Sequence, residues 1–427
     1  MARLAILFDE DTPNAADIAL GAGKLAELSF VCTISDHPVL ELLAELGEVI
    51  DIDAGTERIA ESLSCAGTNG IVTFSDGMLQ QAAELASRLG LPFHSKETVR
   101  LVTDKSAQRA RLRACGVDEV RTSTLHTAAD WPAAVLAVGL PAVLKPASGS
   151  GSRDTYLIRD PRDGLRLAQR LLGDLGAPGG GPFVLEEYLI GKPGLPFADY
   201  ISVESVVSPA GIAHVGVTGN FPMVPPFREI GHFWPSVLAP HERRQVEELT
   251  TRALQALGIS WGLTHTELKL TPDGPRIIEV NGRLGGFISD LARSACGLDL
   301  VEVASRIALG WELPELPSLP DRVHFQYSSP MPAEACTLRG VRGVPQLRKT
   351  PGITGYRSLL AHDIEAAASV MTRRIDMVFG TAADHQEMLA VLDAALPNLR
   401  YDFSMETGDC ELTAADLIDL ARQTPVA

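Results

Sequence analysis

The sequence predicts a multidomain protein that combines an α/β domain with α+β domains. Its 427 residues correspond to about two to four domains at roughly 100–200 residues each. Apolar runs alternate with helical patterns over the first 95 residues, which is typical of a parallel sheet flanked by helices. Beyond residue 96 short strands surround few helices, and one clear hairpin stands among them, which favours antiparallel sheets.

Residues 1–95 are predicted to form an open parallel α/β sheet domain. Its expected strands lie at 4–8, 30–34, 48–52 and 70–74, and its expected helices at 15–28, 39–46 and 79–89. Gly90 and Pro92 follow the last of these helices and are typical stop signals.

Three further units are expected along the chain. Residues 96–189 should hold a linker helix and a small lobe, residues 190–320 a larger lobe, and residues 321–427 a C-terminal α+β domain. The proline-rich residues 313–320 mark the last boundary, and the glycine-rich residues 173–182 are expected to form a surface loop.

The charge balance argues against a nucleic-acid partner. Asp and Glu number 54 against 37 Lys and Arg, a net charge of −17 that would repel a phosphate backbone. The apolar stretch 131–144 contains two prolines and a glycine and is shorter than the roughly 20 residues that span a bilayer, so no membrane segment is expected. The N-terminus lacks the pattern of a secretory signal, so a cytoplasmic location is expected.

A β-hairpin is predicted over residues 264–281, with its turn at Pro272-Asp273-Gly274. A loop centred on Asp273 places Glu267 opposite Glu279, and His265 opposite Asn281. One face then carries His265, Glu267, Lys269, Ile277, Glu279 and Asn281, and the other carries Thr266, Leu268, Ile278 and Val280.

Two carboxylates directly opposite each other repel unless a cation lies between them. Oxygen ligands with an amide oxygen nearby suit a hard divalent cation such as Mg²⁺. The alternative is an exposed hairpin whose acidic side chains are solvated and offset by Lys269.

A phosphate-binding segment is predicted earlier in the chain. Lys145 ends an apolar strand, and residues 148–152 follow as a Gly/Ser loop whose backbone N–H groups can approach phosphate oxygens. A second lysine, Lys105, precedes it by about 40 residues. Residues 184–189 form a strand that runs into a connector, which is suited to holding a flat heterocycle.

Taken in order, these motifs resemble the ATP-grasp superfamily of ATP-dependent carboxylate–amine ligases over residues 95–290. They are Asp-Lys at 104–105, Leu-Lys-Pro at 144–146, Glu-Glu-Tyr-Leu at 186–189, Glu-Leu-Lys at 267–269 and Glu-Val-Asn-Gly-Arg at 279–283. The resemblance implies an ATP-grasp fold in which residues 96–189 contain the lid lobe and residues 190–320 form the catalytic lobe. It also implies ATP and Mg²⁺ as cofactors, with two metal ions that Mn²⁺ can replace.

The same resemblance implies roles for individual residues. The phosphate-binding group would comprise Lys105, Lys145, Ser148, Gly149, Ser150, Gly151 and Ser152. The adenine hinge would comprise Glu186, Glu187, Tyr188 and Leu189. Glu204 would bind ribose or serve as an ordinary strand carboxylate. The metal ligands would be Glu267, Glu279 and Asn281, and the catalytic residues Lys145, Glu279 and Arg283.

Residues 229–236, 264–267 and 281–287 together look like the L-amino-acid ligase branch, which joins an amino acid to a second amino acid, carboxylate or amine. By that resemblance Glu229 and His232 would contact the substrates. Arg283, Gly285 and Gly286 would hold the carboxylate, while Trp234 and Phe287 would shape the pocket. His265 is expected to support the site or to be structural.

The implied activity is amide formation through an acyl phosphate, with release of ADP and phosphate. The implied partners are small carboxylates and amines, with amino acids favoured, and a homodimer is left open. Two alternatives remain, namely a biotin-carboxylase-like enzyme and a nucleotide-binding protein without turnover.

Overall fold

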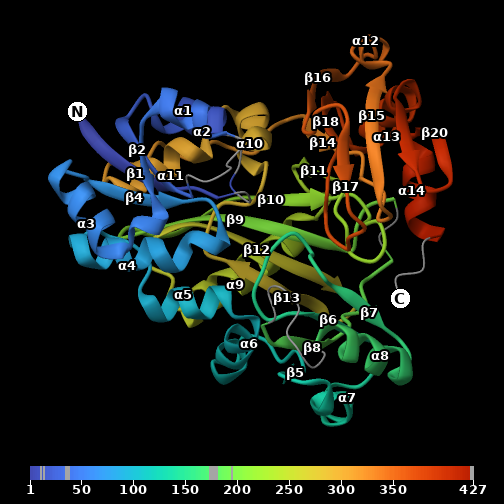
Figure 1. The fold of residues 1–427 in the computed structure, drawn as a ribbon, viewed down its shortest axis with the longest axis horizontal. Helices are drawn as coiled ribbons and strands as arrows, with labels where there is room; N and C mark the ends of the chain where they lie inside the picture. Colours follow the sequence, from blue (N-terminus) through green and yellow to red (C-terminus); the bar gives the residue numbers. More distant parts are fainter. Residues whose placement is uncertain (10–11, 13–14, 34–38, 173–180, 194–195, 424–427) are drawn as a thin grey trace.

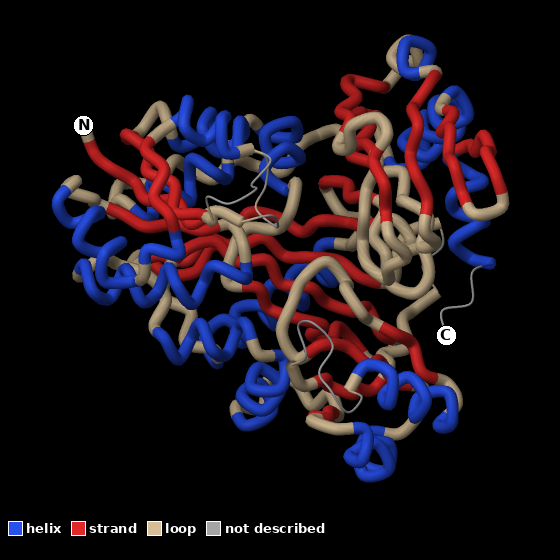
Figure 2. Tube along the Cα trace, viewed as in Figure 1, coloured by secondary structure: helices blue, strands red, loops and turns tan. Residues whose placement is uncertain are grey.

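The computed structural model describes residues 1–9, 12, 15–33, 39–172, 181–193 and 196–423. These residues form one parallel and three antiparallel sheets with helices packed around them (Figures 1 and 2), which confirms the predicted mixed α/β class. The first strand, β1, and the last helix, α14, lie on opposite sides of the view. Most of the predicted loop 173–182 lies outside the described residues.

The N-terminal sheet is parallel, as predicted, with the strand order β3-β2-β1-β4. Its strands are β1 (Ala2–Leu7), β2 (Ala26–Cys32), β3 (Glu48–Asp51) and β4 (Gly70–Thr73). Its helices are α1 (Ala15–Ala22), α2 (Leu40–Leu46), α3 (Thr56–Cys65) and α4 (Leu79–Leu89). Helix α3 was not predicted, because its apolar positions are few and only Ile59 and Leu63 are buried.

Both faces of this sheet are covered, which explains why β1 reads as a continuous apolar run. Leu4 and Ile6 pack into a core shared with α1 and with α11 (Leu300–Ala308), whereas Ala5 and Leu7 pack towards α3 and α4. A helix from far along the chain therefore closes the N-terminal domain.

The small lobe is an antiparallel sheet with the order β5-β8-β6-β7. Its strands are β5 (Thr122–Leu125), β6 (Ala142–Pro146), β7 (Tyr156–Ile158) and β8 (Phe183–Glu187). Its helices are α7 (Trp131–Val138) and α8 (Pro161–Leu171), and two helices lead into it, α5 (Lys96–Thr103) and α6 (Lys105–Ala114). The sequence favoured one linker helix here; Asp104 divides it by accepting hydrogen bonds from the backbone N–H groups of Ser106 and Ala107, so that α6 begins at Lys105.

The largest sheet has eight antiparallel strands in the order β13-β12-β9-β10-β11-β14-β18-β16. They are β9 (Tyr200–Ser208), β10 (Gly211–Asn220), β11 (Gly231–Trp234), β12 (Gly262–Thr271), β13 (Gly274–Asn281), β14 (Val323–Tyr327), β16 (Ile353–Ser358) and β18 (Asp376–Ala382). The helices α9 (Pro240–Ala256), α10 (Ile288–Cys296) and α13 (His385–Ala395) pack against these strands. Since β11 pairs with β14, the sheet continues across the boundary predicted near residue 320.

The C-terminal sheet has the order β17-β15-β19-β20. Its strands are β15 (Cys336–Arg342), β17 (Ile364–Ala366), β19 (Arg400–Met405) and β20 (Gly408–Thr413), and α12 (Val344–Leu347) and α14 (Ala414–Gln423) complete the region. It packs around its own core, which includes Leu338, Tyr401 and Phe403. Across the described part of the chain, no helix combines the length and apolar character needed to span a membrane.

Strands β12 and β13 form the predicted hairpin, and its register near the site is confirmed. Glu267 faces Glu279 and His265 faces Asn281. A bulge after Glu267 then pairs Leu268 with Ile277, so that Ile278 is the extra residue. The predicted faces are therefore wrong at two positions, because Ile277 is fully buried in the core and Ile278 faces the cleft described below.

Candidate active site

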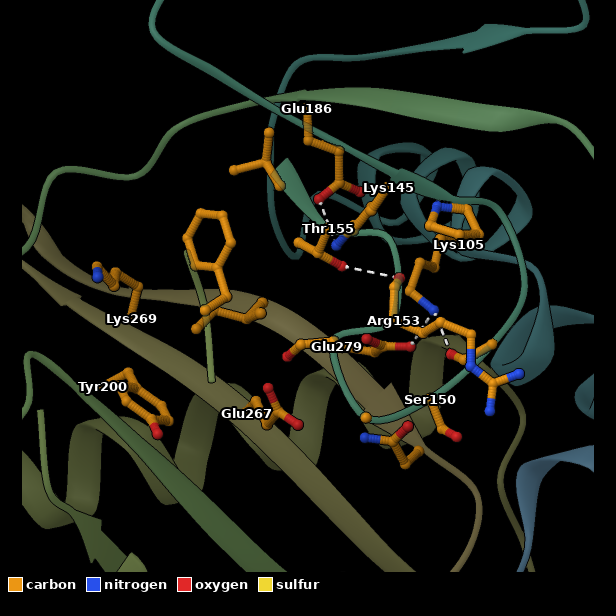
Figure 3. A pocket seen from close by; sticks show the side chains of 18 of the residues that line it. Lys105, Lys145, Ser150, Arg153, Thr155, Glu186, Tyr200, Glu267, Lys269 and Glu279 are labelled. Atoms are coloured by element: carbon orange, nitrogen blue, oxygen red, sulfur yellow. Dashed lines mark hydrogen bonds and ion pairs between the residues drawn. The ribbon is translucent and has the colours of Figure 1, made fainter. Parts of the chain in front are cut away.

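A cleft lies between the small lobe and the β12–β13 hairpin (Figure 3). It encloses about 1130 Å³ of empty space, part of it open to solvent. Most of the predicted site residues line it, namely Lys105, Lys145, Ser148 to Ser152, Glu186 to Leu189, Glu229, Glu267, Glu279, Asn281 and Arg283. Segments that are far apart in sequence thus meet around one opening large enough for a nucleotide and a small substrate.

Lys105 projects from the start of α6 towards the hairpin. Its Nζ lies 2.9 Å from Oε1 of Glu279 and donates a hydrogen bond to the carbonyl oxygen of Gly149 at 2.9 Å. Burial disfavours the charged form of Lys105, but the Glu279 carboxylate nevertheless raises its pKa. The cleft therefore contains a permanent cation at the Gly/Ser loop.

Lys145, at the end of β6, has a buried anionic partner. Its Nζ lies 2.8 Å from Oε2 of Glu186, which also accepts two hydrogen bonds from Arg109 at 2.8 and 3.0 Å. Arg109 in turn donates to the carbonyl oxygens of Ile277 and Ile278 and so ties the small lobe to the hairpin. Burial opposes ionisation of Glu186, but the two cations lower its pKa to about 2.

The contacts of the Glu186 side chain were not predicted from the sequence. Its carboxylate is directed to Arg109 and Lys145 and so fixes the position of that lysine, while its backbone pairs within the sheet with Thr122 and Val143. Arg109 received no role from the sequence, although it follows Lys105 by four residues on one helical face.

The rest of the hinge forms the wall beside Glu186. Glu187 pairs with Arg121 at 2.6 Å, and its backbone N–H donates to the Arg121 carbonyl oxygen. The Tyr188 backbone N–H likewise donates a hydrogen bond to the Pro141 carbonyl oxygen. Glu187, Tyr188 and Leu189 all line the cleft, as predicted for an adenine-facing segment.

The Gly/Ser loop turns sharply as it passes over the lysines. Gly149 and Gly151 have φ values of 132° and 64°, and Ser152 adopts a left-handed conformation with φ of 55°. Two backbone hydrogen bonds connect this region to the C-terminal segment, from Thr372 N–H to the Gly151 carbonyl oxygen and from Asp154 N–H to the Val370 carbonyl oxygen, each 2.9 Å. The loop is therefore held from both sides of the cleft.

Glu267 and Glu279 both project into the cleft from facing positions (Figure 3). Burial opposes ionisation of Glu279, but Lys105 and Lys145 lower its pKa. Asn281 lines the same region, and its amide nitrogen donates a hydrogen bond to the His265 carbonyl oxygen at 3.3 Å. The amide oxygen of Asn281 is therefore directed away from that bond.

This donor set fits a magnesium ion that is bound partly by the protein and partly by phosphate. Among the described residues no three His, Cys, Asp or Glu side chains gather as a metal site, so a closed protein cage is not formed. Two carboxylates and an amide oxygen beside Lys105 and Lys145 match the way Mg²⁺ is usually held with a nucleotide. The predicted ligands Glu267, Glu279 and Asn281 are thus suited to this ion.

His265 and Glu204 lie behind the hairpin carboxylates and do not line the cleft. His265 Nδ1 is 2.9 Å from Oε1 of Glu204, and its Nε2 is 3.6 Å from Oε1 of Glu267. Burial alone would lower the pKa of His265, but the two carboxylates raise it to about 10. Glu204 is 2% exposed and is paired with His265, which fits the second of its two predicted roles, an ordinary strand carboxylate, rather than a ribose contact.

Only one of the three substrate residues predicted in segment 229–236 lines the cleft. Glu229 does so, whereas His232 is buried and its Nδ1 lies 2.6 Å from Oδ1 of Asn220. Burial lowers the pKa of His232 to about 4, so the ring is neutral at pH 7. Trp234 is 1% exposed and packs in the core against Gly216, which contradicts its predicted role in the pocket wall.

The Gly-Gly-Phe segment after Arg283 makes a tight turn next to His265. Phe287 has a left-handed backbone with φ of 61°, and its carbonyl oxygen accepts a hydrogen bond from Gln326. A Cβ at Gly285 would lie 2.5 Å from Nδ1 of His265, whereas one at Gly286 would meet open space. Gly285 therefore permits the histidine to reach Glu204.

Changing Gly285 to alanine is expected to displace His265, lowering kcat/KM by about 10-fold and stability by about 1–3 kcal/mol. The matched control is Gly181→Ala, which adds the same methyl group to open space outside the cleft. Steady-state kinetics and thermal unfolding of both variants test this expectation. Equal behaviour of the two variants would show that the contact with His265 has no consequence.

Arg283 connects the hairpin to the N-terminal domain. Its guanidinium lines the cleft and forms an ion pair with Asp76, which lies just after β4. Burial disfavours the charge on Arg283, but Asp76 raises its pKa. The sequence did not single out Asp76; its only signal was a position at the carboxyl end of a parallel strand, where site residues often lie.

Two further residues were missed on the opposite side of the cleft. The Tyr200 hydroxyl donates to Oε1 of Glu229 at 3.4 Å, and Arg374 donates to Oε2 of the same carboxylate at 3.2 Å. Neither belongs to a recognisable motif, and Arg374 comes from the C-terminal segment.

Comparison with known proteins finds a family match in the central part of the chain. Residues 138–290 match the model of a family described as the ATP-grasp domain. The uncharacterized protein y4rH of Sinorhizobium fredii is 31% identical over 318 residues, which cover 72% of this chain and 64% of that protein. Carnosine synthase 1 of Mus musculus is 30% identical over 271 residues, covering 59% of this chain and 32% of that protein.

Alanine–anticapsin ligase of Bacillus subtilis strain 168 is 26% identical over 261 residues, covering 58% of this chain and 55% of that protein. The chain thus matches less than two thirds of each of these three relatives. Among solved structures, the L-amino acid ligase of Bacillus licheniformis superposes with a TM-score of 0.77 at 19% identity, covering 93% of this chain and 98% of that one. This likeness establishes a shared fold over nearly the whole length.

Proposed function

Because the chain carries an ATP-grasp domain and resembles L-amino acid ligases, we propose that it is an ATP-dependent carboxylate–amine ligase. It joins an amino acid, or a related carboxylate, to an amine and releases ADP and phosphate. The observation that carries this proposal is the arrangement of Lys105, Lys145 and Arg283 around the facing carboxylates Glu267 and Glu279 in one cleft. Two relatives whose names denote ligation or synthesis support it, alanine–anticapsin ligase and carnosine synthase 1.

The proposed chemistry requires this collection of charges. A carboxylate is a poor acyl donor until it receives the γ-phosphoryl group of ATP, and this transfer brings several anions together. Lys105 and Lys145 would hold the phosphates, and Arg283 would neutralise the carboxylate being activated. Bound Mg²⁺, held by Glu267, Glu279 and Asn281, would offset phosphate charge.

The Gly/Ser loop would exclude water while the acyl phosphate exists, since hydrolysis of that intermediate would waste ATP. A hydrogen bond from Thr372 N–H to Gly151, and one from Asp154 N–H just after the loop to Val370, hold it over the lysines. The amine would then attack the acyl phosphate and release phosphate.

The proposal is tested by phosphate release with Mg-ATP across all pairs of the standard amino acids, with mass spectrometry of the active wells. A product whose mass equals the two substrates less one water is expected. Phosphate release that depends on bicarbonate and biotin would instead favour a carboxylase. ATP binding without turnover across a broad panel of carboxylates and amines would favour a non-catalytic nucleotide-binding protein.

Changing Lys145 to alanine is expected to weaken binding of a non-hydrolysable ATP analogue by about 10- to 100-fold, because a charge-assisted contact to phosphate is lost. Glu186 keeps its bidentate bond to Arg109, so the fold should survive. Isothermal titration calorimetry measures the effect, with Lys349→Ala on the exposed surface as the control. Unchanged affinity in Lys145→Ala would show that this lysine does not contact the phosphates.

A further inference from the structure

An arginine from the C-terminal segment lies beside Glu229, well outside the part of the chain that matches the ATP-grasp family. Nη2 of Arg374 donates to Oε2 of Glu229 at 3.2 Å, and its guanidinium lies 5.5 Å from the centre of the Phe287 ring. The side chains of Arg374 and Glu229 are 17% and 25% exposed. The ion pair is thus partly open to solvent next to the cleft.

Most of the hydrogen-bonding capacity of Arg374 is left for a ligand. Within the described residues, its one hydrogen-bond partner is Glu229, which uses one of the five N–H groups of the guanidinium. A guanidinium presents those groups as a planar fork that matches a carboxylate. The attraction between the guanidinium and the Phe287 ring uses none of these N–H groups.

The segment that carries Arg374 is anchored on both sides. The Thr372 hydroxyl accepts a hydrogen bond from the backbone N–H of Glu229, and the Thr372 N–H donates to Gly151 in the Gly/Ser loop. Arg374 itself forms a β-bridge with Pro330. These contacts place the guanidinium at a defined position relative to the cleft.

The Glu229–Arg374 ion pair has its anionic end nearer to the cleft. Glu229, Tyr200 and Glu267 all line the cleft, and the Tyr200 hydroxyl bonds Glu229. Arg374 bonds Glu229 but is not itself among the residues that line the cleft. A ligand lying along the pair therefore presents its cationic end near Glu229, towards the reacting groups, and its anionic end near Arg374.

We infer that Arg374 binds the α-carboxylate of the acceptor amino acid, while Glu229 holds the α-amino group of the same molecule. This inference rests on the proposed function and names its acceptor class as a free α-amino acid. The two charges of the zwitterion align antiparallel to the Glu229–Arg374 pair, so each meets an opposite charge. The α-amino group then points towards the site of the acyl phosphate, and the product keeps a free carboxylate.

The test compares an amino acid with its own α-amide, which keeps the amino group and lacks the anion. The probe is the acceptor that turns over fastest in the screen of amino-acid pairs. For the wild type we expect KM for the amide to exceed KM for the acid by about 10- to 100-fold. Arg374→Met should raise KM for the acid by a similar factor, leave KM for the amide within about 2-fold, and leave the KM of ATP unchanged.

Arg373→Met is the matched control, because it removes the same charge one residue away, where the backbone carbonyl bonds Met331. If Arg374→Met is destabilised, Arg374→Lys is measured in its place. It should retain part of the preference for the acid over the amide, since lysine keeps the charge and lacks the planar fork of the guanidinium. Equal effects of Arg374→Met on acid and amide, or an equal effect of Arg373→Met, would overturn the inference. So would a wild type that does not distinguish acid from amide.

A binding experiment separates this inference from the proposed function. If no amino-acid pair turns over, the wild type and Arg374→Met are titrated calorimetrically with each of the standard amino acids in the presence of a non-hydrolysable Mg-ATP analogue. Binding that Arg374→Met abolishes would support the carboxylate site although ligation had failed. An absence of binding to the wild type would overturn the site as well.

Discussion

Changing Glu279 to glutamine is expected to lower kcat by at least about 100-fold while the fold is retained. The substitution keeps the shape of the side chain and removes its charge. The hairpin would then lose one of its two facing carboxylates, and Lys105 would lose its anionic partner at 2.9 Å. Charge stabilisation of this kind commonly accounts for factors of about 100–1000 in enzymes.

The measurement is kcat over a Mg²⁺ titration, with circular dichroism and thermal unfolding to verify the fold. Glu248→Gln is the control, since it makes the same chemical change on an exposed position of α9. A Glu279→Gln variant whose kcat stays within about 3-fold of the wild type would refute the metal assignment. Rescue by high Mg²⁺ alone would assign the loss to metal affinity.

The facing of Glu267 and Glu279 could be predicted because it depends on local rules. A turn of known type and strict alternation determine which residues oppose each other in a hairpin. The bulge after Glu267 could not be predicted in the same way, because Ile277 and Ile278 are chemically equivalent and either could face the core. It is tertiary packing that buries Ile277 and leaves Ile278 at the cleft.

Contacts between distant segments were the other source of missed residues. Asp76 pairs with Arg283 across 207 positions, and Arg374 pairs with Glu229 across 145. No spacing rule links residues so far apart, and neither Asp76 nor Arg374 belongs to a motif. The prediction for Trp234 failed for a different reason. The surrounding prolines favour a loop, so the short strand β11 that buries Trp234 was not predicted.

Changing Glu186 to alanine is expected to destabilise the protein by about 3–5 kcal/mol, because Arg109 and Lys145 would remain buried without their shared counter-charge. Denaturant unfolding measures the change. Glu187→Ala is the matched control, since the adjacent carboxylate pairs with Arg121, which is 59% exposed, and such pairs contribute at most about 1 kcal/mol. Similar losses in the two variants would show that the buried network is not a major source of stability.

The same carboxylate predicts a specific acid sensitivity. The folded-state pKa of Glu186 is about 2, below the usual value of 4.5, so its stabilising contribution is complete above about pH 4.5 and is lost as the pH falls towards 2. That difference corresponds to about 3 kcal/mol. Subtracting the stability profile of Glu186→Gln from that of the wild type removes the titration of the other carboxylates, and the difference should decline by this amount within that window. A flat difference would mean that Glu186 is not held ionised by Arg109 and Lys145.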